Sequence, residues 1–295
     1  YPRSSFRLGI EAPATAPVAG IPSGTDDGTQ IKFSTAYVMT FVSAFGEEGP
    51  PSLASNVMTK VDGQTIQVTG IRPQQVKSDT NYGYTKSSNA LFATTAGNVA
   101  ATISIANGAA HGLSVGDPVA FTNAASTSGS SDLTLIDLST YVVASVVNSS
   151  SFTITLNQIG GAANTTTTTI DVLLDFKGTK RLYRSNTGSN TTDFQFVAEL
   201  NMSTGFYNDN KNNDQLGEII PSTFHIAPPD DNSTLYPNGQ MKGLTAIGNG
   251  IFAGFSGKRL CFSEPFLPHA WPVAYRITLE DEIVGISMAG NVLFI

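Results

Sequence analysis

The residue types that commonly do chemistry are few in this chain, and their spacing suits no known centre. The three histidines, His111, His225 and His269, show no H-x-x-H or H-x₃-H spacing, and no cysteine pair accompanies them. We therefore expect no metal site. We expect His111 to belong to a turn, and His269 to pack and hydrogen-bond inside an aromatic segment. Cys261, the single cysteine, lies between two apolar residues of a predicted strand, which favours a buried role over a reactive thiol.

Carboxylates cluster in four places, as neighbours in turn-like sequence rather than as separated pairs. They are Asp26-Asp27, Glu47-Glu48, Asp230-Asp231 and the run 280–282. A glycosidase needs two carboxyl groups that converge across a cleft, whereas adjacent carboxylates in turns are usually solvated. No G-x-S-x-G elbow or phosphate-binding loop occurs, and the acidic loop 208–214 lacks the register of a calcium site. The sequence therefore predicts no catalytic residue, no cofactor and no enzyme activity.

The segment 243–272 combines glycine turns with aromatic residues and prolines. Two short apolar strands flank the Ser256-Gly257 turn, which predicts a hairpin, and the prolines that follow exclude a continuing helix. The aromatic side chains predicted to pack or to form an interface are Phe255, Phe262, Phe266, Trp271 and Tyr275. A sugar-stacking platform built from Trp271 and its aromatic neighbours stays open as the alternative.

Composition narrows the class of protein further. Charged residues are 13% of 295, about half of the roughly 25% found in average soluble domains. The formal net charge of −7 offers no basic footprint for nucleic acid, so DNA near this protein would pass without specific binding. No run of 18 apolar residues occurs, and we therefore expect no membrane-spanning segment. The length suits two or three domains.

Period-2 alternation, and the lack of a convincing amphipathic helix, predict an all-β chain. One strand lies within 31–45 and ends at the Gly-Glu-Glu-Gly-Pro-Pro break; another covers 64–69. The strand of 179–188 that should complete this sheet follows only after about a hundred residues. The simplest account is a β-sandwich split by an insertion of five to six short strands. The predicted parts are an extended N-terminal arm (1–32), a split sandwich (33–86 with 177–209), an inserted small barrel-like module (87–176), a linker (210–240) and incomplete propeller-like or meander hairpins (241–295).

Within the last part we expect strands over 244–247, 250–255, 259–262, 275–279, 283–288 and 292–295, joined by tight glycine turns. Consecutive hairpins of this size are typical of a propeller blade or a meander.

Three segments, roughly 37–72, 179–209 and 243–288, together and in this order resemble a phage tail structural protein. The strand and turn of 37–72 resemble the middle of a fibronectin type III-like sandwich, and the barrel-like module resembles one inserted in phage tail proteins. Residues 243–272 contain N-G-I, A-G-F, F-S-E-P and P-H-A-W-P. They resemble a stretch in tail proteins of tailed bacteriophages, especially the short-tailed kind. The resemblance implies a nozzle or tail-tube component of the virion, a ring homo-oligomer, expected as a hexamer, below the portal and adaptor.

In that reading the ring also contacts other tail proteins and guides DNA ejection. Two alternatives remain: a tail or fibre-anchoring protein that binds host-surface glycan through its loops, and an enzyme that degrades surface polysaccharide.

Overall fold

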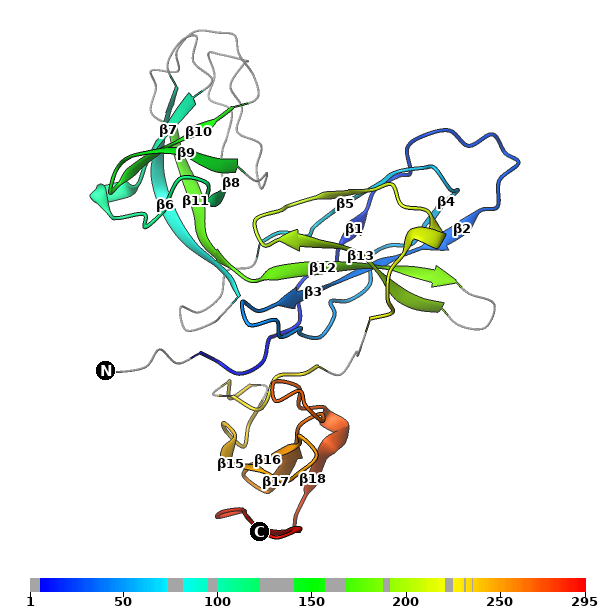
Figure 1. The fold of residues 1–295 in the computed structure, drawn as a ribbon, viewed down its shortest axis with the longest axis vertical. Helices are drawn as coiled ribbons and strands as arrows, with labels where there is room; N and C mark the ends of the chain where they lie inside the picture. The colour runs from blue at the N-terminus through cyan, green and yellow to red at the C-terminus, as the bar shows by residue number, and fades with distance from the viewer. Residues whose placement is uncertain are drawn as a thin grey trace.

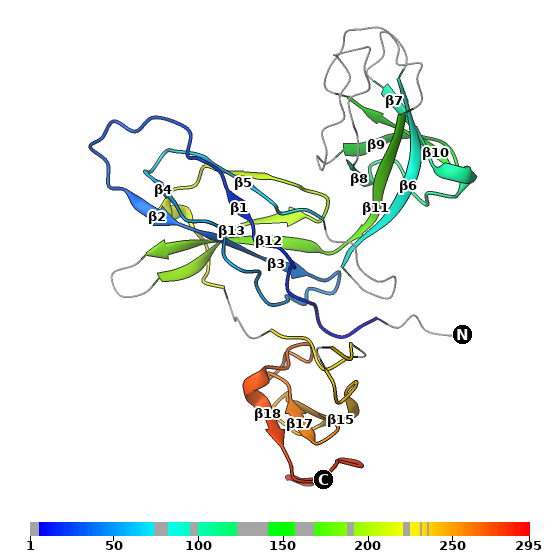
Figure 2. The same cartoon turned by 180° about the vertical axis from the view of Figure 1, so that it is seen from behind.

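The chain folds into three β lobes, seen in Figures 1 and 2 from opposite sides. A computed structural model describes residues 6–73, 82–94, 100–122, 141–156, 168–187, 192–220, 225–230, 232–234 and 236–295. In those ranges, regular structure consists of strands and three short 3-10 turns: η1 (Ala106–Gly108), η2 (Asn213–Gln215) and η3 (Val273–Tyr275). No helix among the described residues is long and apolar enough to cross a membrane. The predicted all-β class is confirmed.

The sandwich pairs two three-stranded antiparallel sheets. One has the order β1–β5–β14 (Val18–Ala19, Ile66–Thr69 and Tyr207–Asp209), and the other has the order β13–β12–β3 (Thr192–Asn201, Thr179–Thr187 and Tyr37–Val42). Apolar side chains from both sheets, including Met39, Val68 and Leu182, share one buried core. The segment expected as an arm thus supplies an edge strand, β1. A two-stranded ribbon, β2 (Phe33–Thr35) with β4 (Met58–Lys60), extends from one end.

Strand β3 is buried along its whole length. On one edge it pairs with β12; on the other, the irregular segment 49–55 donates main-chain N–H groups to the carbonyls of Phe41, Met39 and Tyr37. The main chain of β3 is therefore hydrogen-bonded on both edges. Its side chains are buried on both faces, so it lacks the alternation of exposure that a half-buried strand shows.

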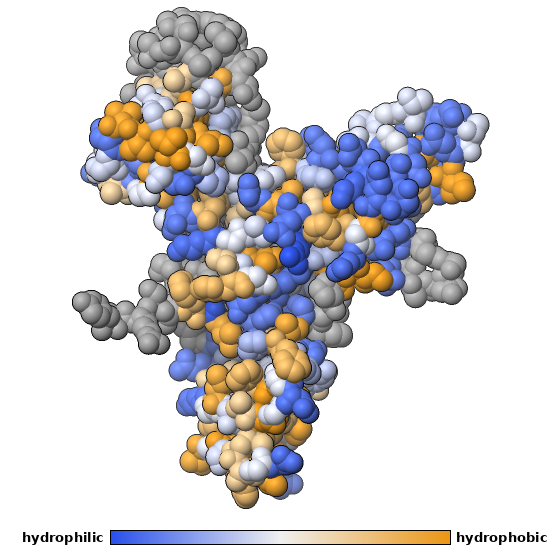
Figure 3. Space-filling model, viewed as in Figure 1, coloured by the Kyte–Doolittle hydropathy of each residue, from blue (hydrophilic) through white to orange (hydrophobic). Residues whose placement is uncertain are grey.

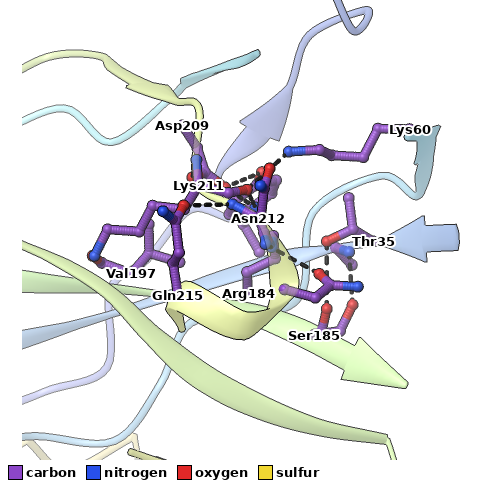
Figure 4. A network of polar contacts seen from close by, with 12 residues as sticks. Thr35, Lys60, Arg184, Ser185, Val197, Asp209, Lys211, Asn212 and Gln215 are labelled. Atoms are coloured by element: carbon purple, nitrogen blue, oxygen red, sulfur yellow. Dashed lines mark hydrogen bonds and ion pairs between the residues drawn. The ribbon is translucent and has the colours of Figure 1, made fainter. Parts of the chain in front are cut away.

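The sandwich interior also holds a buried ion pair, drawn in Figure 4. Arg184 and Asp209 are both fully buried, and Arg184 Nη1 lies 2.5 Å from Asp209 Oδ2. The Tyr37 hydroxyl donates to the same carboxylate oxygen at 2.7 Å. Burial and the neighbouring Asp209 raise the Tyr37 pKa above its usual value. Nearby, Lys60 Nζ donates to the Lys211 carbonyl at 3.1 Å. The pair therefore connects the two sheets, because β3 and β12 belong to one and β14 to the other.

A second polar cluster forms around Glu48, which is 7% exposed. Its carboxylate accepts hydrogen bonds from Thr40 Oγ1 at 2.6 Å, from the Tyr183 hydroxyl at 2.6 Å and from Arg181 Nη1 at 2.8 Å. The expectation of a solvated turn carboxylate is therefore wrong for Glu48. Arg181 and Tyr183 on β12 lie more than 130 residues away in sequence. Their hydrogen bonds compensate the burial of the Glu48 carboxylate, and the local turn sequence gives no sign of them.

Lys180 is also a buried charge, at 1% exposure. Its ammonium group donates to three main-chain carbonyls, those of Ile71, Met202 and Thr204. Burial lowers the pKa of Lys180 to about 7.

The Lys180 pKa predicts a pH-dependent stability. The unfolded lysine keeps its proton up to about pH 10.5, whereas the folded one releases it near pH 7, so between these values the unfolded state binds more protons. Stability should therefore rise with pH, by about 2 kcal/mol between pH 7 and pH 9. Urea unfolding at the two pH values measures this change. The same pair of measurements on Lys180→Met cancels the contributions of other groups, and an equal rise in that variant would contradict the assignment.

The inserted lobe is a closed antiparallel barrel of order β10–β7–β6–β11–β8–β9. Its strands are β6 (Gly83–Thr94), β7 (Ala100–Ser104), β8 (Pro118–Thr122), β9 (Tyr141–Asn148), β10 (Ser151–Thr155) and β11 (Thr168–Lys177). Inward residues such as Ile103, Phe121 and Phe152 are fully buried in one core. Register shifts lie near Asn89 in β6 and Asp175 in β11, and both residues have left-handed φ values, 59° and 54°. Such bulges bend the strands and help the barrel to close.

The barrel-like insertion is thus confirmed as a closed barrel. Strand β6, however, begins at Gly83, so the expected boundary between 86 and 87 falls inside a continuous strand. The reason is that β6 and β11 pair over most of their length as one long ribbon, which runs from the sandwich into the barrel. Alternation alone does not show where a strand passes from one core to another.

The C-terminal lobe is a four-stranded antiparallel meander, β15 (Lys242–Ala246), β16 (Phe252–Ser256), β17 (Arg259–Phe262) and β18 (Arg276–Thr278). A hairpin of β19 (Ser287–Ala289) and β20 (Val292–Phe294) follows. The strand expected over 275–279 starts later, because η3 occupies Val273–Tyr275. The strand expected over 283–288 is wrong: only its last two residues join β19, and Ile283 instead turns inward to cover the sheet.

Residues 6–11 lie between the sandwich and the C-terminal lobe. The Phe6 ring packs edge-on against Phe45 of the sandwich, with centroids 5.3 Å apart. Arg7 forms an ion pair with Asp230. Gly9, at φ +83°, fits so closely that an added Cβ would lie 2.8 Å from the Ala227 Cβ. This short segment therefore contacts both lobes at once.

Candidate assembly surface

The four-stranded meander has one apolar face, and that face is half covered. Phe255 and Leu260 are directly paired on β16 and β17 and are buried beneath Ile283. They lie at the end of the sheet where β15 begins, since Lys242 pairs with Phe255. Phe262, two residues beyond Leu260 on the same face, is half-buried and packs against the same cluster.

An apolar groove lies beside Phe262 and extends to Ile277, which pairs with Leu260. It has a volume of about 320 Å³ and is lined mainly by Ile247, Ile251, Phe262, Pro265, Tyr275 and Ile277. Tyr275 and Ile277 remain 42% and 52% exposed. Such a groove offers a partner apolar surface with little polar competition.

The structure divides the five predicted packing or interface aromatics. Trp271 is fully buried; its indole Nε1 donates to the Pro268 carbonyl at 2.8 Å, and its main-chain N–H donates to the Ile226 carbonyl at 2.7 Å. Phe255 is also buried. Phe262 and Tyr275 both line the groove. Of the five aromatics, these two and Phe266 are accessible to a partner.

Phe266 projects from the turn at the rim of the groove and is 78% exposed. Its φ of +61° is a left-handed value that bulky residues rarely adopt. The Phe266 N–H donates to the Gly250 carbonyl at 2.8 Å, and its ring lies over Gly250, where an added Cβ would come within 2.4 Å of it. A strained backbone that displays an apolar side chain is typical of a binding surface.

Sequence reasoning missed Ile247, Ile251 and Ile277 as groove residues. Ile277 could have been found, because the R-I-T strand places a single isoleucine between polar neighbours. Ile247 and Ile251 flank a glycine turn, and nothing in their local pattern separates them from core residues.

The histidines take structural places. His111 Nε2 lies 3.0 Å from the Asn148 carbonyl oxygen, and its Nδ1 accepts from the Leu113 N–H at 2.9 Å, which ties together a turn of the barrel. His225 and His269 are both buried with ring centroids 5.8 Å apart. Burial lowers the pKa of His269 against the opposing pull of Glu47. Over the described ranges, no three His, Cys, Asp or Glu side chains group in a way that could hold a metal ion.

Cys261 is buried in β17, and burial raises the pKa of its thiol, which makes it a poor nucleophile.

Comparison with known proteins gives little beyond this. No family model matches the chain, and no curated protein matches it. A solved structure, the phage phi92 endosialidase, aligns over 78% of this chain and 36% of its own length, at 13% sequence identity and a TM-score of 0.24. The chain thus spans about a third of that protein. A TM-score of this size carries no inference about shared fold or activity.

Proposed function

We propose that this chain is a structural component of a bacteriophage tail, a nozzle or tail-tube ring of six copies below the portal and adaptor. Support comes from the resemblance of three separate segments to tail proteins and from the low charge content. The role is mechanical: copies assemble into a conduit, and a mildly acidic wall lets DNA pass during ejection without holding it. No residue is assigned a catalytic role.

The observation that carries this proposal is the surface of the C-terminal lobe. Among the described residues of this lobe, the hydrophobic cluster has three buried members, Phe255, Leu260 and Ile283. The side chains left more than half exposed include Val273, Ile277, Val284, Val292 and Phe294. Figure 3 shows how apolar residues dominate this lobe, at the bottom of the view. Exposed apolar surface on this scale favours contact with other subunits.

Electron microscopy of the particle that carries this chain tests the proposal. A closed ring of six copies on the tail axis is the expected result. Copies arranged as peripheral spikes would contradict it and would favour the glycan-binding alternative. A glycan-release assay on host envelope material should yield no product, and a released sugar would contradict a purely mechanical role.

The second candidate, binding of host-surface glycan, has one observation in its favour. A cavity of about 520 Å³ lies at the base of the barrel, lined in part by Thr85, Asp117, Asp175 and Phe176. Carboxylates beside an apolar ring suit a neutral sugar, and barrel mouths commonly hold ligands. A glycan array probed with the protein and with Asp117→Ala tests it: saccharide binding that the substitution abolishes would support this candidate, and absence of binding would reject it.

A further inference from the structure

Two buried histidines meet where the C-terminal lobe joins the sandwich. His225 lies in the segment 225–230, and His269 lies between β17 and η3. Both are 5% exposed, and their rings form an edge-to-face contact with centroids 5.8 Å apart. One nitrogen of each ring, His225 Nδ1 and His269 Nε2, is buried and has no hydrogen-bond partner among the described residues. Buried polar atoms normally have partners, so this pair requires an explanation.

The surroundings of His269 bring three parts of the chain together. Its ring is hydrogen-bonded to the main chain of Glu48 in the sandwich. Its carbonyl oxygen would lie 3.0 Å from a Cβ added at Gly9, so the N-terminal segment fits closely against it. Beside the pair, the Trp271 N–H donates to the Ile226 carbonyl at 2.7 Å. The histidine pair therefore lies at the joint of the sandwich, the N-terminal segment and the C-terminal lobe.

Electrostatic influences on His269 oppose one another. Burial is the largest, and it lowers the pKa of His269 below the ordinary value of 6.5. The Glu47 carboxylate works against this shift, whereas the neighbouring His225 adds to it. Other charged groups of the segments packed here are bound to other partners; they are Glu48, Arg7, Glu11, Asp230 and Arg276.

We propose that the His225–His269 pair is a pH switch, which keeps the joint between the C-terminal lobe and the sandwich closed while both rings are neutral and opens it in acid. A protonated imidazole carries an N–H donor at both ring nitrogens. In the closed joint, protonation would leave buried N–H groups at His225 Nδ1 and His269 Nε2 without acceptors, and would set two cations side by side. The switch belongs to a single copy and does not depend on ring assembly.

The direction of the effect follows from proton binding. In the open joint water solvates the rings, so the open state binds more protons than the closed one. The closed joint is therefore fully favoured above about pH 6.5, where a solvated ring is neutral, and it loses stability as the pH falls below that value.

Amide hydrogen exchange of the full-length protein at pH 7 and pH 5 tests the switch. The Trp271 amide donates across the joint to Ile226, so peptides that cover 264–271 report opening. We expect their exchange, relative to the intrinsic rate at each pH, to rise about tenfold or more at pH 5. Peptides from β3 and β12 should keep their protection, because the sandwich itself stays folded.

Energy transfer measures whether the lobes separate. Trp271 is the only tryptophan and serves as the donor. The acceptor is a dansyl group on Leu53→Cys, an 81% exposed position of the sandwich, in a chain that also carries Cys261→Ala to remove the native thiol. Transfer, corrected at each pH with the unlabelled protein, should fall between pH 7 and pH 5.

Glutamine replacements identify the groups that titrate, because glutamine keeps a polar side chain but does not change its charge. His269→Gln and His225→Gln should each reduce the change in exchange to about threefold or less. His111→Gln, at the third histidine of the chain, lies in the barrel and should keep the full change. Glu47→Gln should enlarge the change, since it removes the charge that favours a protonated His269 in the closed joint.

Each contrary outcome overturns the switch. Equal exchange and equal energy transfer of the wild type at the two pH values would do so, and so would a response that both glutamine variants of the pair keep in full. Exposure of β3 and β12 to the same degree would show general acid unfolding instead of an opened joint. The wild-type measurement decides even where a variant fails to fold.

Discussion

Replacing Asp209 with alanine is expected to lower the free energy of unfolding of the sandwich by about 3–5 kcal/mol. The substitution leaves Arg184 charged, fully buried and without its carboxylate, because Arg184 Nη1 keeps only the Lys211 carbonyl at 3.0 Å. It also leaves the Tyr37 hydroxyl without the acceptor at 2.7 Å. An uncompensated buried guanidinium accounts for most of the expected loss, since desolvation costs persist when the attraction is gone.

The measurement must isolate the sandwich from the other lobes. Trp271, the only tryptophan, lies between β17 and η3 of the C-terminal lobe, so its fluorescence reports the unfolding of that lobe and not of the sandwich. Hydrogen exchange of peptides from β3 and β12 in increasing urea follows the unfolding of the sandwich itself. The control replaces the partners together, as Tyr37→Phe, Arg184→Met and Asp209→Leu, and should recover much of the loss because no buried charge remains. A single-variant loss below about 1 kcal/mol would contradict the account, since even one net hydrogen bond contributes that much.

Asp209 also shows where sequence reasoning reached its limit. It stands at the start of an Asn- and Asp-rich stretch, 208–214, whose composition predicts an exposed loop. The structure pairs it with β5 and buries it completely, because Arg184 and Tyr37 arrive from two other strands. Partners so far apart in sequence leave no local signal. Glu48 was misassigned for the same reason.

What the sequence did predict rests on local physics. Alternation identified β3 and β5, and the repeated short strands of the insertion predicted a compact barrel. The glycine turn at 256–257 is the loop that joins β16 to β17. The candidate surface was predicted only in part: aromatic content indicated the right segment, but not that Trp271 is internal while Ile277 and Phe266 are exposed. Residues 279–293 pack against the side chains of β16 and β17, and this tertiary contact decides which of those side chains are buried. The local sequence of the strands carries no sign of it.

The joint between the barrel and the sandwich should be the most sensitive place for a small substitution. Gly178 connects β11 of the barrel to β12 of the sandwich and has a φ of +71°. A Cβ added there would lie 2.1 Å from the Val42 carbonyl oxygen and 3.2 Å from the Ser43 main chain. These atoms are backbone within or beside β3, which is paired with β12, so neither can move without disturbing the ladder.

We therefore expect Gly178→Ala to lower the stability of the sandwich by about 3 kcal/mol or more, combining the steric clash with left-handed strain. The same hydrogen-exchange measurement on β3 reports it. Gly63→Ala is the matched control, since Gly63 also has a positive φ, +83°, but has no atom within 4 Å of the added carbon. That control should lose only about 1–2 kcal/mol, the cost of the left-handed backbone for alanine. Equal losses of stability in the two variants would contradict this account. They would show that backbone strain alone causes the loss and that the contact of Gly178 with β3 contributes nothing.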